Sequence, residues 1–362
     1  MHILLLKKSP FEGISMQELV QQIKGRKIAE KKFPFLLKEH IVFPPHLNIE
    51  QASSQNTAEY KAQFFKGKKM VDLTTGFGID AYFLGQNFQE VTLIEQNTEL
   101  IEIVTHNWNI LGKKARFLNQ NLESFLDENT EIFDLIYLDP ARRDQNKRKV
   151  FLLKDLSPNV LDIQEKLFEI SDKILIKLSP LIDLTHLKAH LQKIAKIWVI
   201  AVKNEVKEIL VFMDKTWDKE TVDVHCVNLE SEESDFIFNL NDEKSATSEF
   251  SEPEKFLYLP NNSVLKSGAF NLISEKFNLK KLHQNTHLYT SSEKIESFPG
   301  RVLEVEKIES KCLKKGSQFN IISKNHPLSA EEIKKKYKLK DGGNQYLIFT
   351  QTQKAKIILK SL

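Results

Sequence analysis

The sequence has little cysteine and no long apolar stretch. Cys226 and Cys312 are the only two cysteines among 362 residues, and neither has a Cys or His partner at metal-ligand spacing. This pattern excludes a disulfide scaffold and argues against a structural zinc site. The chain also lacks the roughly 18 uncharged apolar residues of a membrane span, and the apolar run 3–6 is too short for a signal-peptide core. We therefore expect a soluble protein of a reducing, cytoplasmic compartment.

The net charge is small but unevenly distributed. The whole chain carries +3, whereas residues 294–362 hold 15 Lys/Arg against 7 Asp/Glu, a net charge of +8. A basic module of this kind is the electrostatic footprint of a protein that follows a phosphate backbone. Lysine-rich solvated surfaces have the same composition, so the charge alone leaves both interpretations open. The length of the chain points to two or three domains.

Short apolar segments alternate with helical stretches through the first two thirds of the chain. The expected strands are 70–73, 91–94, 115–118, 133–138, 174–178 and 197–202. This rhythm predicts a parallel α/β sheet that holds ligands at the carboxyl ends of its strands. A further strand, 208–213, follows too soon for a crossover helix, so it must form an antiparallel hairpin with 197–202. An antiparallel last strand is typical of Rossmann-like methyltransferases and is usually absent from dinucleotide dehydrogenases.

The regions outside this repeat have other patterns. Residues 15–39 show helical periodicity with a Ser15/Glu18 capping box, and Ser53-Ser54 precedes a second expected helix at 55–65. The acidic segment 230–254 is interpreted as an exposed linker or an acidic hairpin at a domain boundary. From about residue 256 onward, the mixture of strands, helices and turn residues indicates a compact α+β module.

A glycine-containing turn follows the first expected strand. Gly76 and Gly78 allow close approach of a ligand, and Asp72 at the strand end can bind a positively charged amino group or stabilise the turn. Glu95 ends the second strand, 23 residues later, where a carboxylate can accept hydrogen bonds from both ribose hydroxyls of a nucleoside cofactor. After the third strand, Asn121 is suited either to bind an adenine amino group or to cap a helix.

A carboxylate and a basic cluster follow the fourth strand. Asp139 stands at the sheet edge before the rigid Pro140, and it is the first catalytic candidate, because methyl transfer needs alignment of the acceptor more than proton removal. The expected substrate-binding residues are Arg142, Arg143, Lys147 and Arg148, unless this basic loop is simply solvated. His186 and His190 lie one helical turn apart without a third ligand, so no metal site is expected.

Several segments together carry a family resemblance. They are 51–58 (QASSQNTA), 72–80 (DLTTGFGID), 139–144 (DPARRD), 157–160 (SPNV), 176–180 (IKLSP), 204–208 (NEVKE), 286–290 (THLYT), 298–301 (FPGR) and 341–343 (DGG). With these motifs the chain resembles the bacterial class I methyltransferases that carry a C-terminal THUMP-like domain, over about residues 49–350. Thr75 departs from the family loop, which usually has a second glycine there. This threonine either tightens the cofactor pocket or, if the position needs φ > 0, weakens binding.

The resemblance implies a seven-stranded, mostly parallel Rossmann-like core with an antiparallel last strand. It also implies four regions: a helical N-terminal segment (1–66), a methyltransferase domain (67–229), a ferredoxin-like module (255–297) and a THUMP-like domain (298–362). S-adenosylmethionine is the implied cofactor and RNA the implied substrate. The expected cofactor-binding residues are Asp72, Thr74, Gly76, Phe77, Gly78, Glu95, Asn121, Asp139 and Pro140.

Other functions stay open at this point. A covalent attack on a pyrimidine is disfavoured because neither cysteine lies beside Asp139 in the sequence. Methylation of a nitrogen is easier to support, although Pro140-Ala141-Arg142 lacks the aromatic residue that stacks on a flipped base. The alternatives are a methyltransferase with a non-RNA substrate, a non-catalytic RNA-binding protein and, less well supported, a nicotinamide dehydrogenase.

Overall fold

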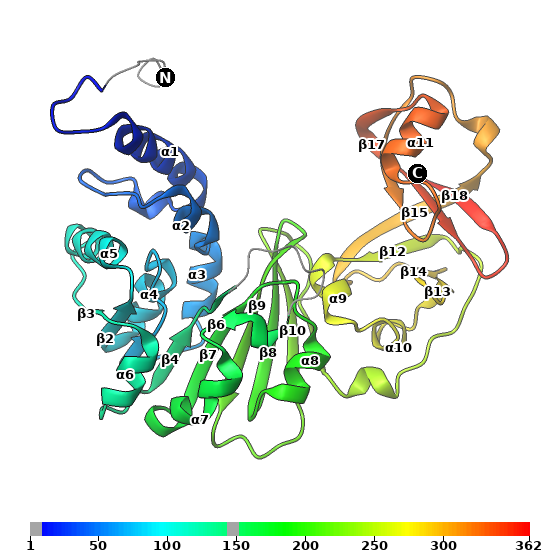
Figure 1. Cartoon of the computed structure of the whole chain (residues 1–362). Coiled ribbons are helices and arrows are strands. Elements are labelled where there is room, and N and C mark those ends of the chain that lie inside the picture. Colours follow the sequence, from blue (N-terminus) through cyan, green and yellow to red (C-terminus); the bar gives the residue numbers. More distant parts are fainter. Residues whose placement is uncertain (1–8, 143–151) are drawn as a thin grey trace. The chain divides into compact units, whose positions relative to one another are not determined.

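The structure is a computed structural model that describes residues 9–142 and 152–362 (Figure 1). It contains two units, one of Met1–Lys196 and Ile209–Lys219 and the other of Ile197–Glu208 and Glu220–Leu362. Within the described part of the chain, no helix is both long and apolar enough to cross a membrane.

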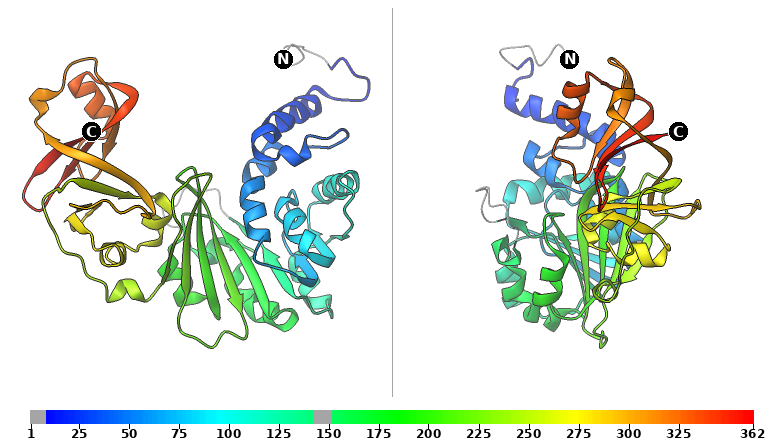
Figure 2. Two further views of the ribbon diagram at one scale, coloured as in Figure 1. Left: turned by 180° about the vertical axis from the view of Figure 1, so that it is seen from behind. Right: turned by 90° about the vertical axis from the view of Figure 1, so that its right-hand side faces the viewer.

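The first unit alternates strands and helices. Its helices are α1 (Met16–Lys32), α2 (His46–Gln51), α3 (Gln55–Ala62), α4 (Ile79–Leu84), α5 (Thr98–Ile110), α6 (Leu122–Glu128), α7 (Val160–Ile170) and α8 (Leu184–His190). Its strands are β1 (Gly67–Asp72), β2 (Phe88–Glu95), β3 (Arg116–Asn119), β4 (Leu135–Leu138), β5 (Ala141–Arg142), β6 (Leu156–Ser157) and β7 (Lys173–Leu178), and the hairpin strands β8 (Ile194–Val202) and β9 (Glu205–Asp214) pass between the units. Helices lie alongside the strands in both views of Figure 2.

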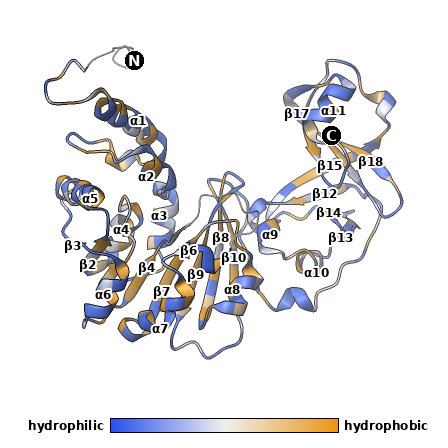
Figure 3. Cartoon of the chain, in the orientation of Figure 1, coloured by the Kyte–Doolittle hydropathy of each residue, from blue (hydrophilic) through white to orange (hydrophobic). Residues whose placement is uncertain are grey.

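The main sheet has the strand order β11-β10-β8-β9-β7-β4-β1-β2-β3. The pairs β2–β3, β1–β2, β1–β4 and β4–β7 are parallel, whereas β9 runs antiparallel to β7. The expected antiparallel strand is therefore confirmed. The sheet has nine strands rather than the expected seven, because β10 (Asp223–Leu229) and β11 (Phe236–Asn239) extend it beyond β8. Apolar residues concentrate in the strands of this sheet (Figure 3).

The N-terminal segment packs on the glycine loop. Helix α1 begins at the expected Ser15/Glu18 capping box but ends at Lys32, short of the expected residue 39, because Pro34 cannot continue a helix. Ser54 caps α3, which ends at Ala62 rather than at residue 65. Phe33 and Phe43 are buried in one hydrophobic cluster with Phe77 of the loop. The segment is therefore part of the core that supports the loop.

The second unit contains a mixed sheet and three helices among its described elements. In chain order they are β10, β11, β12 (Phe256–Pro260), α9 (Asn262–Ser267), α10 (Leu272–Lys276), β13 (Lys280–His283), β14 (Thr286–Ser291), β15 (Gly300–Ile308), β16 (Gln318–Ser323), α11 (Ala330–Tyr337), β17 (Lys340–Gln351) and β18 (Lys356–Ser361). The sheet order is β13-β14-β12-β15-β18-β17-β16, in which β16–β17 is the parallel pair. One core packs around Leu257 and Ile348, and a second packs Ile333 of α11 against Phe349. These strands and helices form the α+β module that the sequence predicts.

The acidic segment 230–254 includes a strand and helix-capping contacts. Strand β11 lies within it and pairs antiparallel with β10. The Glu243 carboxylate accepts hydrogen bonds from the backbone N–H of Asn271 and Leu272 at the start of α10. A negative charge at a helix N-terminus satisfies donors that the helix itself cannot pair. Part of the acidic charge therefore has a structural role within the second unit.

Candidate active site

The loop between β1 and α4 bends tightly at the edge of the sheet. The backbone N–H of Thr74 donates to Asp72 Oδ1 at 2.9 Å, which holds the start of the turn. Gly76 and Gly78 have φ values of 53° and 73°, a region that residues with a Cβ rarely adopt. A Cβ built on Gly76 would have Thr74 O at 3.8 Å as its nearest neighbour. The space above Gly76 is therefore open to a ligand.

Gly78 has a packing role that Gly76 lacks. A Cβ there would lie 3.0 Å from Val104 Cγ1 and 3.2 Å from Trp108 Nε1, both on α5. Gly78→Ala is expected to lower the free energy of unfolding by about 2–4 kcal/mol, from left-handed strain and overpacking together. Gly112 is the matched control, because it has φ +70° and no atom within 4 Å of a Cβ. Gly112→Ala should cost only the strain, about 1–2 kcal/mol by denaturant titration, and equal losses in the two variants would contradict the packing argument.

Thr75 does not need the conformation that only glycine tolerates easily. The positive φ values of the loop belong to Gly76 and Gly78, and Thr75 is not among the residues with positive φ. Its N–H donates to the carbonyl of Ile94 at 3.0 Å, and its carbonyl accepts from Gly78 N at 2.8 Å. Threonine therefore fits this position without backbone strain.

Glu95 is connected to the loop by its carboxylate. Oε2 accepts from Gly76 N at 3.0 Å and Oε1 accepts from Asn97 N at 2.9 Å. Each carboxylate oxygen can accept a second hydrogen bond, so Glu95 keeps acceptor capacity beside the open space at Gly76. These free acceptor positions suit the hydroxyl groups of a ribose, as in a nucleoside cofactor. Asn119 supports the strand end, because its amide donates to the carbonyls of Glu95 and Gln96.

Two of the expected cofactor-binding side chains have structural contacts. Asn121 caps α6, since its side-chain oxygen accepts from Ser124 N at 2.8 Å. The ring of Phe77 is buried and packs edge-on against Phe33, with ring centroids 5.8 Å apart. The backbone of Phe77 belongs to the loop, but its ring belongs to the core.

Asp139 lies directly opposite the glycine loop. Its backbone N–H donates to Thr74 Oγ1 at 2.6 Å, which connects the end of β4 to the loop after β1. Its side chain is 38% exposed, and Oδ2 forms an ion pair with Lys177 Nζ at 2.7 Å. The next residue, Pro140, is buried. Asp139 therefore combines a fixed backbone, one engaged oxygen and access to solvent.

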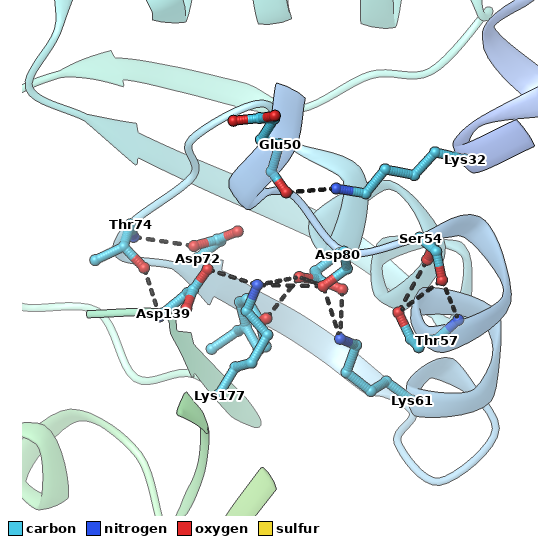
Figure 4. Close-up of polar contacts among 12 residues, drawn as sticks. Lys32, Glu50, Ser54, Thr57, Lys61, Asp72, Thr74, Asp80, Asp139 and Lys177 are labelled. Carbon is cyan, nitrogen blue, oxygen red and sulfur yellow. Dashed lines mark hydrogen bonds and ion pairs between the residues drawn. The ribbon is translucent and has the colours of Figure 1, made fainter. Parts of the chain in front are cut away.

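A buried polar network extends from Asp139 into the core (Figure 4). Lys177 Nζ lies 3.5 Å from Asp80 Oδ2 and 3.2 Å from Ser53 Oγ. Lys61 Nζ pairs with Asp80 Oδ1 at 2.8 Å and donates to Ser53 Oγ at 3.0 Å. Asp80 Oδ2 also accepts from Ser53 Oγ and Tyr137 OH, each at 2.7 Å. Asp80 is therefore the central acceptor of this network.

The three nearby carboxylates differ in how strongly their surroundings favour the ionised form. Burial alone raises the pKa of Asp80, but the ammonium groups of Lys61 and Lys177 outweigh burial and hold that pKa below its usual range. Burial also raises the pKa of Asp139, and Lys177 opposes the rise. Burial raises the pKa of Asp72 well above normal, although the Thr74 N–H favours its charged form. Asp80 is thus the carboxylate with the strongest preference for ionisation.

The sequence predicts Asp72, Glu95 and Asp139 as site residues but assigns no role to Lys61 or Lys177. Both lysines lie within the segments that carry the family resemblance or close to them, and both are nearly inaccessible, at 0% and 8% side-chain exposure. The sequence signal that could have identified such a lysine is its position between apolar residues of a strand, as in the β7 sequence KILIKL. A charge inside a buried strand needs a partner.

The remaining candidates have different outcomes. Arg143, Lys147 and Arg148 lie outside the described residues, and Arg142 is described only as the β5 residue that pairs with Leu156. The rings of His186 and His190 lie 4.1 Å apart on α8. Within residues 9–142 and 152–362, no group of three or more His, Cys, Asp or Glu could hold a metal ion.

The buried Cys226 offers little nucleophilic character. Cys226 is buried, and burial raises the pKa of its thiol to about 12, so the reactive thiolate is scarce at neutral pH. Cys312 is exposed on the second unit. The buried thiol of Cys226 agrees with the argument against a covalent pyrimidine mechanism.

The whole chain matches a solved structure with the same architecture. A crystal structure described as a "putative methyltransferase" from Porphyromonas gingivalis W83 superimposes with a TM-score of 0.87 and 31% identity, covering 99% of this chain and 93% of that chain. Residues 51–176 match the family described as "Conserved hypothetical protein 95", and residues 300–360 match the family described as "THUMP domain-like". The chain belongs to the class I methyltransferase family that carries a C-terminal THUMP-like domain.

This methyltransferase also matches the family described as a ferredoxin-like domain, over residues 256–299. A curated relative, "Uncharacterized RNA methyltransferase MMOB5020" from Mycoplasma mobile, is 29% identical over 93 residues. The match covers a quarter of each chain. Family membership therefore rests on the full-length structural match and the domain matches.

Proposed function

We propose that this methyltransferase transfers a methyl group from S-adenosylmethionine to a base in RNA. The observation that carries the cofactor assignment is the open space above Gly76, with the Glu95 carboxylate bonded to the Gly76 N–H beside it. A carboxylate next to a glycine turn at the carboxyl ends of two parallel strands matches the requirements of a bound nucleoside. Asp72, Thr74, Gly76, Gly78 and Glu95 would hold the cofactor. The bound sulfonium would supply the electrophilic methyl group.

Asp139 would orient the methyl acceptor. It lies beside Thr74 of the proposed cofactor loop, and its side chain is the accessible end of the buried network. A carboxylate in its charged form accepts hydrogen bonds and donates none. It would therefore align an acceptor that carries an N–H group, and alignment is the main requirement of methyl transfer.

Four observations support RNA as the substrate. Residues 294–362 carry a net charge of +8, and residues 300–360 match the family described as THUMP domain-like. Lys335 and Lys336 are exposed on α11, in the same module. The Mycoplasma mobile relative is named an RNA methyltransferase. Clustered lysines bind phosphates without reading base sequence, so the module would present the RNA while the first unit selects the nucleotide.

Isothermal titration with S-adenosylmethionine, S-adenosylhomocysteine and NAD tests the cofactor. We expect binding of the first two ligands, and Glu95→Ala should weaken it by about 10- to 100-fold, because hydrogen bonds to a charged group contribute about 1.5–3 kcal/mol. Glu102→Ala is the matched control, an exposed carboxylate on α5. RNA from cells lacking the gene is then tested for acceptance of labelled methyl groups. Binding of NAD alone, or transfer to small molecules but to no RNA, would refute the proposal.

A further inference from the structure

Lys177 occupies a position where a charge is unfavourable by itself. It lies in β7, which pairs with β4 on one side and β9 on the other, and its neighbours Ile176 and Leu178 are buried. The Lys177 side chain is only 8% exposed. Burying an ammonium costs several kcal/mol, which a carboxylate partner offsets only with good geometry. An apolar side chain would meet the packing requirement, so the charge points to a role beyond stability.

Lys177 contacts two buried partners, which are held in place by other residues, and one partner that is accessible to solvent. Asp80 and Ser53 are themselves held by Lys61, whose side chain is fully buried. Lys177 Nζ lies closer to the carboxylate of Asp139, at 2.7 Å, than to that of Asp80, at 3.5 Å, and Asp139 is the more exposed of the two. Figure 4 shows the Lys177 amine between Asp139 and Asp80. The buried network therefore fixes the ammonium that contacts Asp139.

The two oxygens of Asp139 differ. Oδ2 is engaged by Lys177, whereas no described residue forms a hydrogen bond or ion pair with Oδ1. The backbone of Asp139 is fixed separately, by the hydrogen bond to Thr74 Oγ1. The ion pair with Lys177 thus sets the rotation of the Asp139 carboxylate, while the hydrogen bond to Thr74 holds the main chain. Oδ1 remains available for a substrate.

We propose that Lys177 is a positioning residue that holds the Asp139 carboxylate in one orientation, with Oδ1 presented to the methyl acceptor. This inference rests on the proposed function of Asp139. Lys61, Ser53 and Asp80 act one step further away, because they hold Lys177. The N-terminal segment thereby contributes to the site through Lys61 of α3 and through Ser53, the residue before the α3 cap.

The proposal has a pH signature. Among the described residues, the charged groups that act on Asp139 are Lys177 on β7, Asp80 on α4, Lys61 on α3 and Asp72 on β1. Removing Lys177 removes the main charge that opposes burial, so the pKa of Asp139 should rise further. The ionised carboxylate of Asp139 is a stronger acceptor for an N–H group than the protonated form. A higher pKa means that the ionised form is lost at a higher pH. The acid limb of the rate profile should therefore move to higher pH.

Lys177→Met and Lys177→Arg test the inference, with Lys173→Met as the matched control at the exposed start of the same strand. We expect the single-turnover rate of Lys177→Met on accepted RNA to fall by about 10- to 100-fold, the effect of a small misplacement of the reacting groups. Affinity for S-adenosylhomocysteine should change little. Lys177→Arg should recover part of the rate, and Lys173→Met should match the wild type.

A second readout needs no substrate. Carbon-13 NMR of the aspartate carboxyl groups, with the Asp139 signal assigned from Asp139→Asn, should show Asp139 titrating at higher pH in folded Lys177→Met. An unchanged titration, or an unchanged rate profile, would overturn the inference. Loss of S-adenosylhomocysteine binding together with the rate would also overturn it, by placing Lys177 in the cofactor pocket. If the wild type accepts no cofactor, the proposed function fails while the titration still decides the role of Lys177.

Discussion

Asp80→Asn is expected to lower the free energy of unfolding by about 3–5 kcal/mol, the cost of breaking a buried ion pair by removing one partner. The variant leaves the ammonium groups of Lys61 and Lys177 facing each other across a neutral amide. Lys61 is fully buried, and the hydroxyl of Ser53, to which it also donates, is neutral and cannot balance its charge. Unfolding in urea, followed by circular dichroism, measures the loss.

The control and the pH dependence separate this effect from ordinary surface electrostatics. Asp127→Asn removes an exposed partner of Lys166 and should cost less than about 1 kcal/mol. The pKa of Asp80 is lowered in the folded state, so its contribution is fully present above the unfolded pKa of about 3.9 and is lost as the pH falls below it. The difference between wild type and Asp80→Asn should therefore shrink in acid. A difference that is small at neutral pH, or that grows in acid, would contradict the ion-pair interpretation.

The sequence predicts the elements whose signals are local. The Ser15/Glu18 capping box, the cap at Ser54 and the hairpin of β8 and β9 all depend on residues within a few positions of one another. The alternation of strands and helices likewise predicts that the strands from β1 to β7 in the main sheet run parallel, because strands joined by crossover helices lie parallel in one sheet. Strand β10 is missed. Strand β11 lies in the acidic segment 230–254, which the sequence leaves open between an exposed linker and an acidic hairpin, because a short strand in an acidic segment has the composition of a linker.

The polar network could not be predicted in the same way. Lys61 and Lys177 are 116 positions apart in the sequence, and each has the appearance of a solvated lysine on its own element. Only the fold brings α3, α4 and β7 together around Asp80. Asp72, Glu95 and Asp139 are easier to predict as candidates, because each stands at the carboxyl end of a strand, where the parallel sheet collects its ligands.

Asp139→Ala is expected to slow methyl transfer by at least about 100-fold while leaving cofactor affinity within about tenfold of the wild type. The backbone N–H of residue 139 still donates to Thr74 Oγ1 in this variant, so the loop that would hold the cofactor keeps its support. Only the carboxylate that would align the acceptor is lost. Single-turnover transfer to accepted RNA, with cofactor affinity measured separately by titration, distinguishes the two effects.

Asp139→Asn separates the contribution of the carboxylate's shape from the contribution of its charge. The amide keeps one acceptor oxygen but loses the charge that pairs with Lys177, so a rate between those of wild type and Asp139→Ala is expected. If Asp139→Asn retains the wild-type rate while Asp139→Ala does not, an acceptor oxygen suffices and the charge of the ion pair is not needed to orient it. If Asp139→Ala itself retains the wild-type rate, the acceptor is aligned by other groups. In that case the Lys177–Asp139 pair serves the structure of the sheet edge rather than methyl transfer.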